Sequence, residues 1–193
     1  MSEYCDKDRY VFIVKSMLVV LNNGRSDIAS SFTNAVMRIN TAGALIDSAK
    51  NYQKECSEFL ERLAVDDEDK SVLENIKTEM GNWIDKFTVQ SEELSEAKSA
   101  LTTIDDRMDS CEDAIEDFLT AVELGEDISD ENLLLDVKSI SDKGIDIKND
   151  LDDALNNCRE HLVRCTIQMQ DFDKYRLSMA VVLTDIRNNK FNV

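Results

Sequence analysis

The chain has 193 residues, with 40 acidic and 22 basic side chains, so its formal net charge at pH 7 is −18. A charge of this sign repels phosphate backbones, which argues against binding to nucleic acid. The chain also contains no proline and only five glycines, so it has few residues that end a helix. Its mixture of 42% apolar and 32% charged residues excludes a disordered or a membrane-spanning chain by composition.

The first predicted element is a helix over residues 8–65. From Val11 to Leu63, seam positions recur at alternating spacings of three and four, and most of them are apolar, which is typical of a helix face that packs in a coiled coil. The sequence Asn-Asn-Gly that ends at Gly24 is a common helix end, but the spacing continues through it in phase. We therefore expect one long helix or two collinear ones, with a bend or short break near Gly24 and no reversal of direction. The alternative is a true helix end at Gly24, followed by a new helix that Ser26 or Asp27 caps.

The second predicted helix spans residues 70–124. Its apolar pattern runs from Leu73 to Val122, and Gln90 is its one polar member. Ser71, followed three residues later by a glutamate, forms a capping-box signature at the start. Gly125 is suited to the left-handed conformation that often ends a helix.

The third predicted helix spans residues 131–187, and Ser129 or Asp130 is expected to cap its start. Its pattern of spacings of three and four begins at Leu133 and reaches Ile186. The polar residues after 187 are expected to fray.

Three helices of similar length joined by two short acidic turns favour antiparallel neighbours. We therefore predict an all-α fold, an elongated up-down-up antiparallel bundle of three long helices with coiled-coil-like packing. The bundle is expected to be a single domain over residues 1–193.

Cys158, His161 and Cys165 share one face of the third helix, because their spacings are three and four. Thiolates and imidazole are good zinc or copper ligands, but a closed zinc site needs a fourth ligand, which this pattern lacks. The alternative that we favour makes them core residues, with His161 in a polar layer beside Gln90 and Gln168. We therefore expect neither a metal nor another cofactor.

The chain has five cysteines and no clear secretory signal. An odd number of cysteines favours free thiols in a reducing compartment. We therefore expect a cytoplasmic protein, and secretion is the alternative.

Acidic residues are concentrated between Asp105 and Asp136, where thirteen carboxylates accompany one base, Arg107. The spacing does not match a helix-loop-helix calcium site. Asp109, Asp113 and Asp117 are therefore candidates for contacts with a basic protein partner, and the alternative is a solvated surface.

The segment from Tyr10 to Leu21 carries more apolar residues than two neighbouring helices would cover. A contiguous exposed apolar patch usually marks a partner surface. A smaller apolar excess occurs over residues 177–183. The candidate contact residues in the first segment are Phe12, Ile13, Met17, Val19 and Val20. The alternative is that this part of the helix lies centrally in the bundle, or that these side chains pack under a kink.

No glycine-rich phosphate loop or paired catalytic group is present in the sequence, so we expect a protein that is not an enzyme. The hypothesis that uses most of these features is a helical scaffold or protein-interaction module, which forms a homodimer or binds another protein. The alternative is a membrane-active helical protein that contacts lipid through Tyr10 to Leu21.

Overall fold

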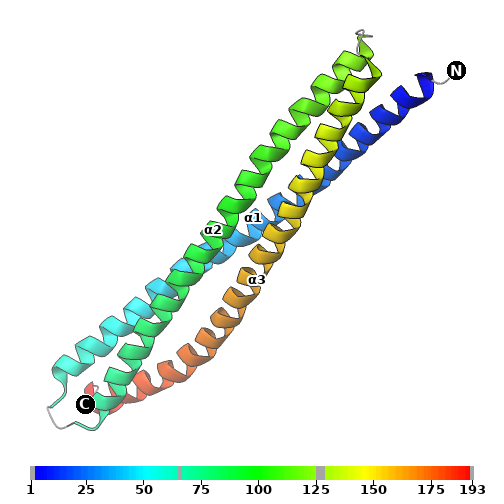
Figure 1. The fold of residues 1–193 in the computed structure, drawn as a ribbon. Helices are drawn as coiled ribbons and strands as arrows, with labels where there is room; N and C mark the ends of the chain where they lie inside the picture. The colour runs from blue at the N-terminus through cyan, green and yellow to red at the C-terminus, as the bar shows by residue number, and fades with distance from the viewer. Residues whose placement is uncertain (1–2, 65–66, 125–128, 192–193) are drawn as a thin grey trace. The chain divides into compact units, whose positions relative to one another are not determined.

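The computed structural model describes residues 3–64, 67–124 and 129–191. These residues form three α-helices, α1 (Glu3–Arg62), α2 (Asp69–Glu123) and α3 (Asp130–Phe191), and no strand occurs among them (Figure 1). The all-α, three-helix prediction is therefore confirmed. The predicted helix end at Gly125 lies outside the described residues.

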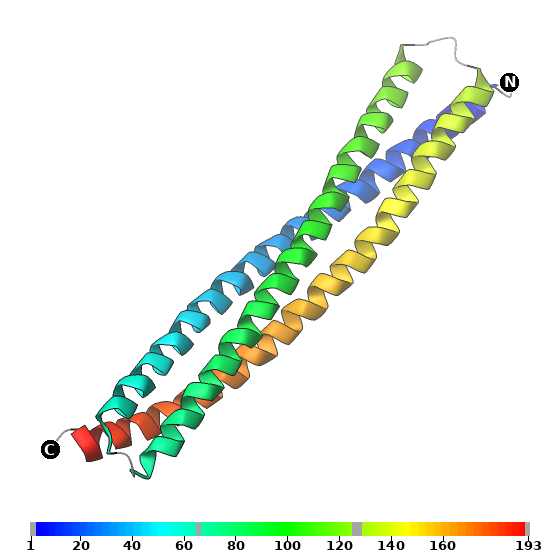
Figure 2. The same ribbon diagram turned by 60° about the vertical axis from the view of Figure 1, so that its left-hand side comes forward.

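Contacts divide the chain into two compact units. Unit 1 comprises Met1–Thr33 and Ala97–Arg159, and unit 2 comprises Asn34–Glu96 and Glu160–Val193. Each helix contributes one segment to each unit and continues from one unit into the other without a break (Figure 2). The expectation of a single domain over the whole chain stays a prediction.

Contacts in unit 1 show that α1 and α2 are antiparallel. Arg25 of α1 forms an ion pair with Asp109 of α2. Seven residues further along α1, the Phe32 ring lies 5.7 Å from the Lys98 ammonium nitrogen, measured to the ring centroid. The position along α2 therefore decreases as the position along α1 increases.

Contacts in unit 2 show the same relation between α2 and α3. His161 Nδ1 lies 3.1 Å from Glu93 Oε2, and the rings of Phe172 and Phe87 lie 5.4 Å apart between centroids. The position along α2 again decreases as that along α3 increases. The predicted antiparallel relation is therefore present between α1 and α2 in unit 1 and between α2 and α3 in unit 2.

The core follows the predicted apolar pattern most closely on α2. Every position of that pattern from Leu73 to Phe118 is buried, including Gln90, and Val122 is half-buried. On α1, one of the two predicted seam positions in each heptad is buried and the other is half-buried. The buried seam positions of α1 are Val14, Leu21, Ile28, Ala35, Ala42, Ala49 and Cys56. Gly24 and Phe59 are buried outside the predicted seam.

The buried stripe of α3 departs from its predicted positions after Cys165. Met169 and Leu183 are buried where the sequence pattern pointed to Gln168 and Val182, which are half-buried. A straight helix has 3.6 residues per turn, so its buried face drifts relative to a repeat with spacings of three and four. At these two positions the buried residue lies one place later than predicted, whereas Phe172, Met179 and Ile186 are buried at their predicted positions.

No break occurs at Gly24, which lies within α1. A Cβ atom at this position would lie 2.6 Å from Met108 Cε and 2.7 Å from Leu151 Cδ2. The glycine therefore serves close packing against side chains of α2 and α3. The continuous apolar phase correctly indicated that the chain does not reverse direction at Gly24, whereas the short break expected there does not occur.

The helix bounds differ from the predicted ones by three to five residues at both ends of α1 and at the end of α3, and by one residue elsewhere. The Asp69 backbone N–H donates to Asp67 Oδ1 at 3.0 Å, so Asp67 caps α2 and the predicted cap Ser71 does not. At the same end of unit 2, α3 continues to Phe191, whose ring lies 4.9 Å from that of Phe59 and under the Arg62 guanidinium. These contacts explain why the helix extends past residue 187.

Candidate interaction surfaces

The predicted apolar surface of α1 is divided between solvent and the interior of unit 1. Phe12 and Val19 are 71% and 59% exposed, whereas Ile13, Met17 and Val20 are half-buried. Met17 packs where a Cβ at Gly144 of α3 would lie. Of the five candidates, therefore, only Phe12 and Val19, one heptad apart, are exposed enough to contact a partner.

Val20 contributes to the lining of a cavity of about 190 Å³ in unit 1. Leu21, Met108 and Leu151 also line this cavity. The half-buried part of the α1 segment therefore faces the other two helices of its unit.

A more extended apolar surface lies on α3 in unit 2. Val163 and Ile167 are 54% and 53% exposed, and Leu177 and Val181 are 67% and 61% exposed. Gln170 and Lys174, also exposed, complete a row with spacings of four, three, four, three and four. We call this row, Val163, Ile167, Gln170, Lys174, Leu177 and Val181, the α3 stripe.

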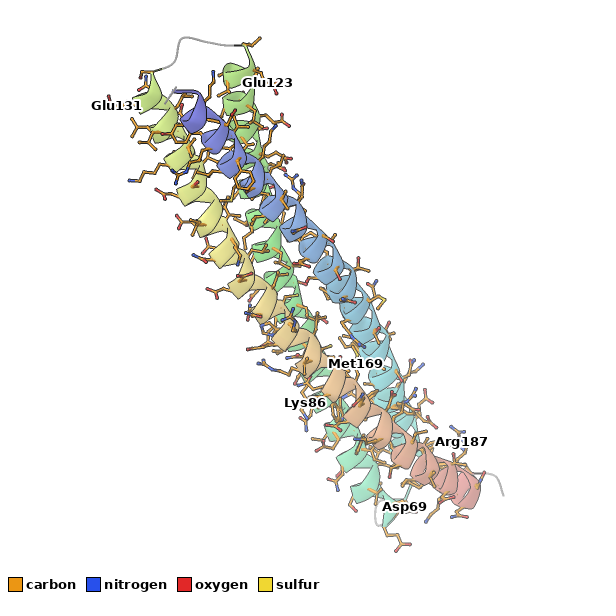
Figure 3. The ribbon with its side chains drawn as sticks, turned by 90° about the vertical axis from the view of Figure 1, so that its right-hand side faces the viewer. Asp69, Lys86, Glu123, Glu131, Met169 and Arg187 are labelled. Atoms are coloured by element: carbon orange, nitrogen blue, oxygen red, sulfur yellow. The ribbon has the colours of Figure 1, made fainter. Side chains whose placement is uncertain are left out.

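The α3 stripe lies on the helix face opposite the core. At 100° per residue, Phe172 points about 180° away from Val163 and Val181, and Phe172 is fully buried. The C-terminal half of the stripe lies between the labelled residues Met169 and Arg187 in Figure 3. The sequence signal at 177–183 included two of its members, but Val163 and Ile167 were not identified.

The ion pairs of unit 1 occupy part of the acidic segment. Arg25 pairs with Asp109 and Glu112, and its Nε lies 3.7 Å from Asp105 Oδ1. Burial alone would lower the pKa of Arg25, but the hydrogen bond to Glu112 and the nearby carboxylates raise it. Asp109 is therefore held within the unit.

Asp113 and Asp117, the other two acidic candidates, are exposed. Asp117 also lines a cavity of about 390 Å³ between α2 and α3 of unit 1, together with Phe118, Asp136 and Lys143. The three predicted acidic contact residues therefore have different surroundings.

The predicted polar layer forms around a residue that the sequence analysis did not identify. Glu93 Oε2 accepts a hydrogen bond from Gln90 Nε2 at 2.6 Å and lies 3.1 Å from His161 Nδ1. Arg164 Nη1 donates to the same oxygen at 3.2 Å. Glu93 follows Gln90 by three residues, and Arg164 follows His161 by three. This spacing, which places each pair on one face of its helix, is the sequence signal that could have identified Glu93 and Arg164.

The third predicted member of the layer, Gln168, does not join it. Gln168 Oε1 is buried and has no hydrogen-bond partner among the described residues, and Gln90 Oε1 is in the same situation. A buried acceptor without a partner costs stability. The layer therefore links α2 to α3 through one carboxylate at some cost in stability.

The four cysteines whose side chains are described, Cys56, Cys111, Cys158 and Cys165, are free and buried. Burial raises the pKa of each thiol, and for Cys56 it raises the pKa to about 11. These thiols are protonated at neutral pH, whereas a metal ligand or nucleophile is a thiolate. Within residues 3–64, 67–124 and 129–191, no group of three or more histidine, cysteine or acidic side chains could hold a metal ion.

No helix in the described part of the chain is long and apolar enough to cross a membrane. The chain matches no protein-family model, no curated protein and no solved structure.

Proposed function

We propose that the protein is a non-enzymatic helical interaction module that associates with itself through the α3 stripe, in the cytoplasm. The observation that carries the proposal is the presence of four exposed apolar side chains at coiled-coil spacing, Val163, Ile167, Leu177 and Val181. A helix of a partner molecule can cover such a row by inserting its own side chains between them. A single isolated apolar residue on the surface would need no such explanation.

The charge around the α3 stripe also supports self-association. Residues 160–190 carry five basic and four acidic side chains, although the whole chain has a net charge of −18. Like-charge repulsion between two copies is therefore smaller at this surface than at the acidic segment around Asp113. Each apolar side chain removed from water would contribute roughly 1–2 kcal/mol, which opposes the cost of association.

The proposal is tested by the solution mass of three forms of the full chain, measured by light scattering over a range of protein concentrations. We expect the wild type to form a dimer and an Ile167→Ser, Leu177→Ser variant to be a monomer with unchanged helix content by circular dichroism. The matched control is Phe12→Ser, Val19→Ser, which removes two exposed apolar side chains from α1. We expect this control to remain a dimer.

A monomeric wild type would overturn the proposal. Dissociation of the control alone would assign the assembly surface to α1. If the wild type is monomeric and floats with liposomes, and the α1 variant does not, then the membrane-active function replaces the proposed one.

A further inference from the structure

We infer that the partner on the α3 stripe is a second copy of this chain in the antiparallel orientation, with Gln170 of each copy opposite Lys174 of the other. This inference rests on the proposed function and adds the orientation and register of the pair. It concerns only the segment of α3 in unit 2, where every stripe residue is exposed.

The order of side chains along the stripe is symmetric about residue 172. Val163 and Val181 are equally distant from this point, as are Ile167 and Leu177, and the two polar members lie nearest to it. A two-fold axis at this level would therefore place apolar residues on apolar residues at both ends. It would also bring Gln170 of one copy beside Lys174 of the other, since such an interface is self-complementary.

The polar centre distinguishes the antiparallel from the parallel orientation. A parallel pair in register would place Lys174 against Lys174 of the second copy, and like charges at facing positions repel. In the antiparallel pair, the amide oxygen of Gln170 can accept a hydrogen bond from that lysine. Lys174 Nζ also donates to Asp171 of its own helix at 3.0 Å.

The test is disulfide cross-linking of the full chain in a Cys5→Ser background, in which the four remaining cysteines are buried. Gln170→Cys and Lys174→Cys variants carry tags of different size and are oxidised singly and as an equal mixture. We expect the mixed disulfide to form at least fivefold faster than the disulfide of Lys174→Cys with itself. Val89→Cys, at an exposed apolar position on α2, gives the collisional background rate.

Rapid self-linking of Lys174→Cys would show a parallel pair and overturn the inference, while the proposed function would stand. Background rates for all variants, together with a dimeric mass, would place the interface elsewhere and also overturn the inference. A monomeric mass would overturn the inference and the proposed function together.

A variant without new cysteines provides a second measurement. Gln170→Glu places a carboxylate opposite Lys174 in the antiparallel pair, and we expect the dimer dissociation constant to fall severalfold at low salt. In a parallel pair the same change would place two carboxylates together. A rise in the dissociation constant would therefore contradict the antiparallel orientation.

Discussion

The two units use the same heptad spacing but fill their cores differently. In unit 2, the rings of Trp83, Phe87 and Phe172 lie 5.4–5.8 Å apart between centroids. In unit 1, pockets of about 390, 270 and 190 Å³ that open to solvent lie along the contacts between the helices. The comparison shows that periodicity fixes which face of a helix is buried, whereas side-chain volume decides how completely that face is filled.

The units also differ in where their apolar and charged side chains meet solvent. The acidic segment between Asp105 and Asp136 belongs to unit 1, where Arg25 neutralises part of it. The α3 stripe belongs to unit 2, in a segment with nearly balanced charge. The two units therefore offer different surfaces to other molecules.

The largest expected effect comes from removing an aromatic ring from each core. Phe172→Ala in unit 2 should lower the free energy of unfolding by about 3–5 kcal/mol, because Phe172 is fully buried against two other rings. Phe118→Ala in unit 1 should cost roughly half as much, because Phe118 already lines a cavity. Urea unfolding followed by circular dichroism, at one protein concentration, measures both.

An equal or larger loss for Phe118→Ala would contradict the difference in core packing. It would mean that the cavity beside Phe118 does not reduce the contacts that its ring makes.

A smaller effect is expected from two glycine substitutions. A Cβ atom added at Gly43, in α1 of unit 2, would meet no neighbouring atom within 4 Å, so Gly43→Ala should stabilise the helix by about 0.5–1 kcal/mol. Gly24→Ala in unit 1 stabilises the helix backbone by the same amount, but the added methyl group must displace the buried ends of the Met108 and Leu151 side chains. We expect a net loss of about 1 kcal/mol for it.

Thermal unfolding of the two glycine variants beside the wild type measures the difference. A stabilised Gly24→Ala variant would show that unit 1 has enough free space to accept a methyl group at its helix contacts.

The smallest expected effect concerns the charged end of unit 2. The Asp69 backbone N–H and the Lys190 ammonium group both lower the pKa of Asp67. A carboxylate with a lowered pKa in the folded state stabilises the protein above its unfolded pKa, and this stabilisation is lost as the pH falls through the folded pKa. Asp67→Ala should therefore be less stable than the wild type at pH 7, and the difference should vanish in acid.

Urea midpoints measured between pH 7 and pH 2 test this dependence, with Asp47→Ala, at an exposed position in unit 2, as the control. A difference between the Asp67 variant and the wild type that persists unchanged at the lowest pH would exclude the carboxylate as its cause.

The sequence predicted the central helix with the fewest errors. All positions of its predicted pattern from Leu73 to Phe118 are buried as expected, because a strict pattern of threes and fours leaves only one face for the core. It was less successful on α3, where Met169 replaces Gln168 in the core. The position of a drifting contact line depends on how the neighbouring helices curve, which local spacing does not specify.

The candidate surfaces were harder to predict than the helices. Val163 and Ile167 stand between polar residues, and single apolar residues on a surface are ordinary. Glu93 was one of many acidic residues, and only its contacts with His161 and Arg164 distinguish it from a solvated carboxylate.

The sequence by itself determined the three helices, their order and their buried faces, because backbone hydrogen bonding and apolar periodicity are local properties of the chain. The tertiary structure alone decided which apolar side chains remain exposed. Met17 and Val20 turn toward neighbouring helices while Phe12 and Val19 do not, and the α3 stripe faces away from the core. These outcomes depend on which neighbour covers each side chain, and that is a property of the packed helices together.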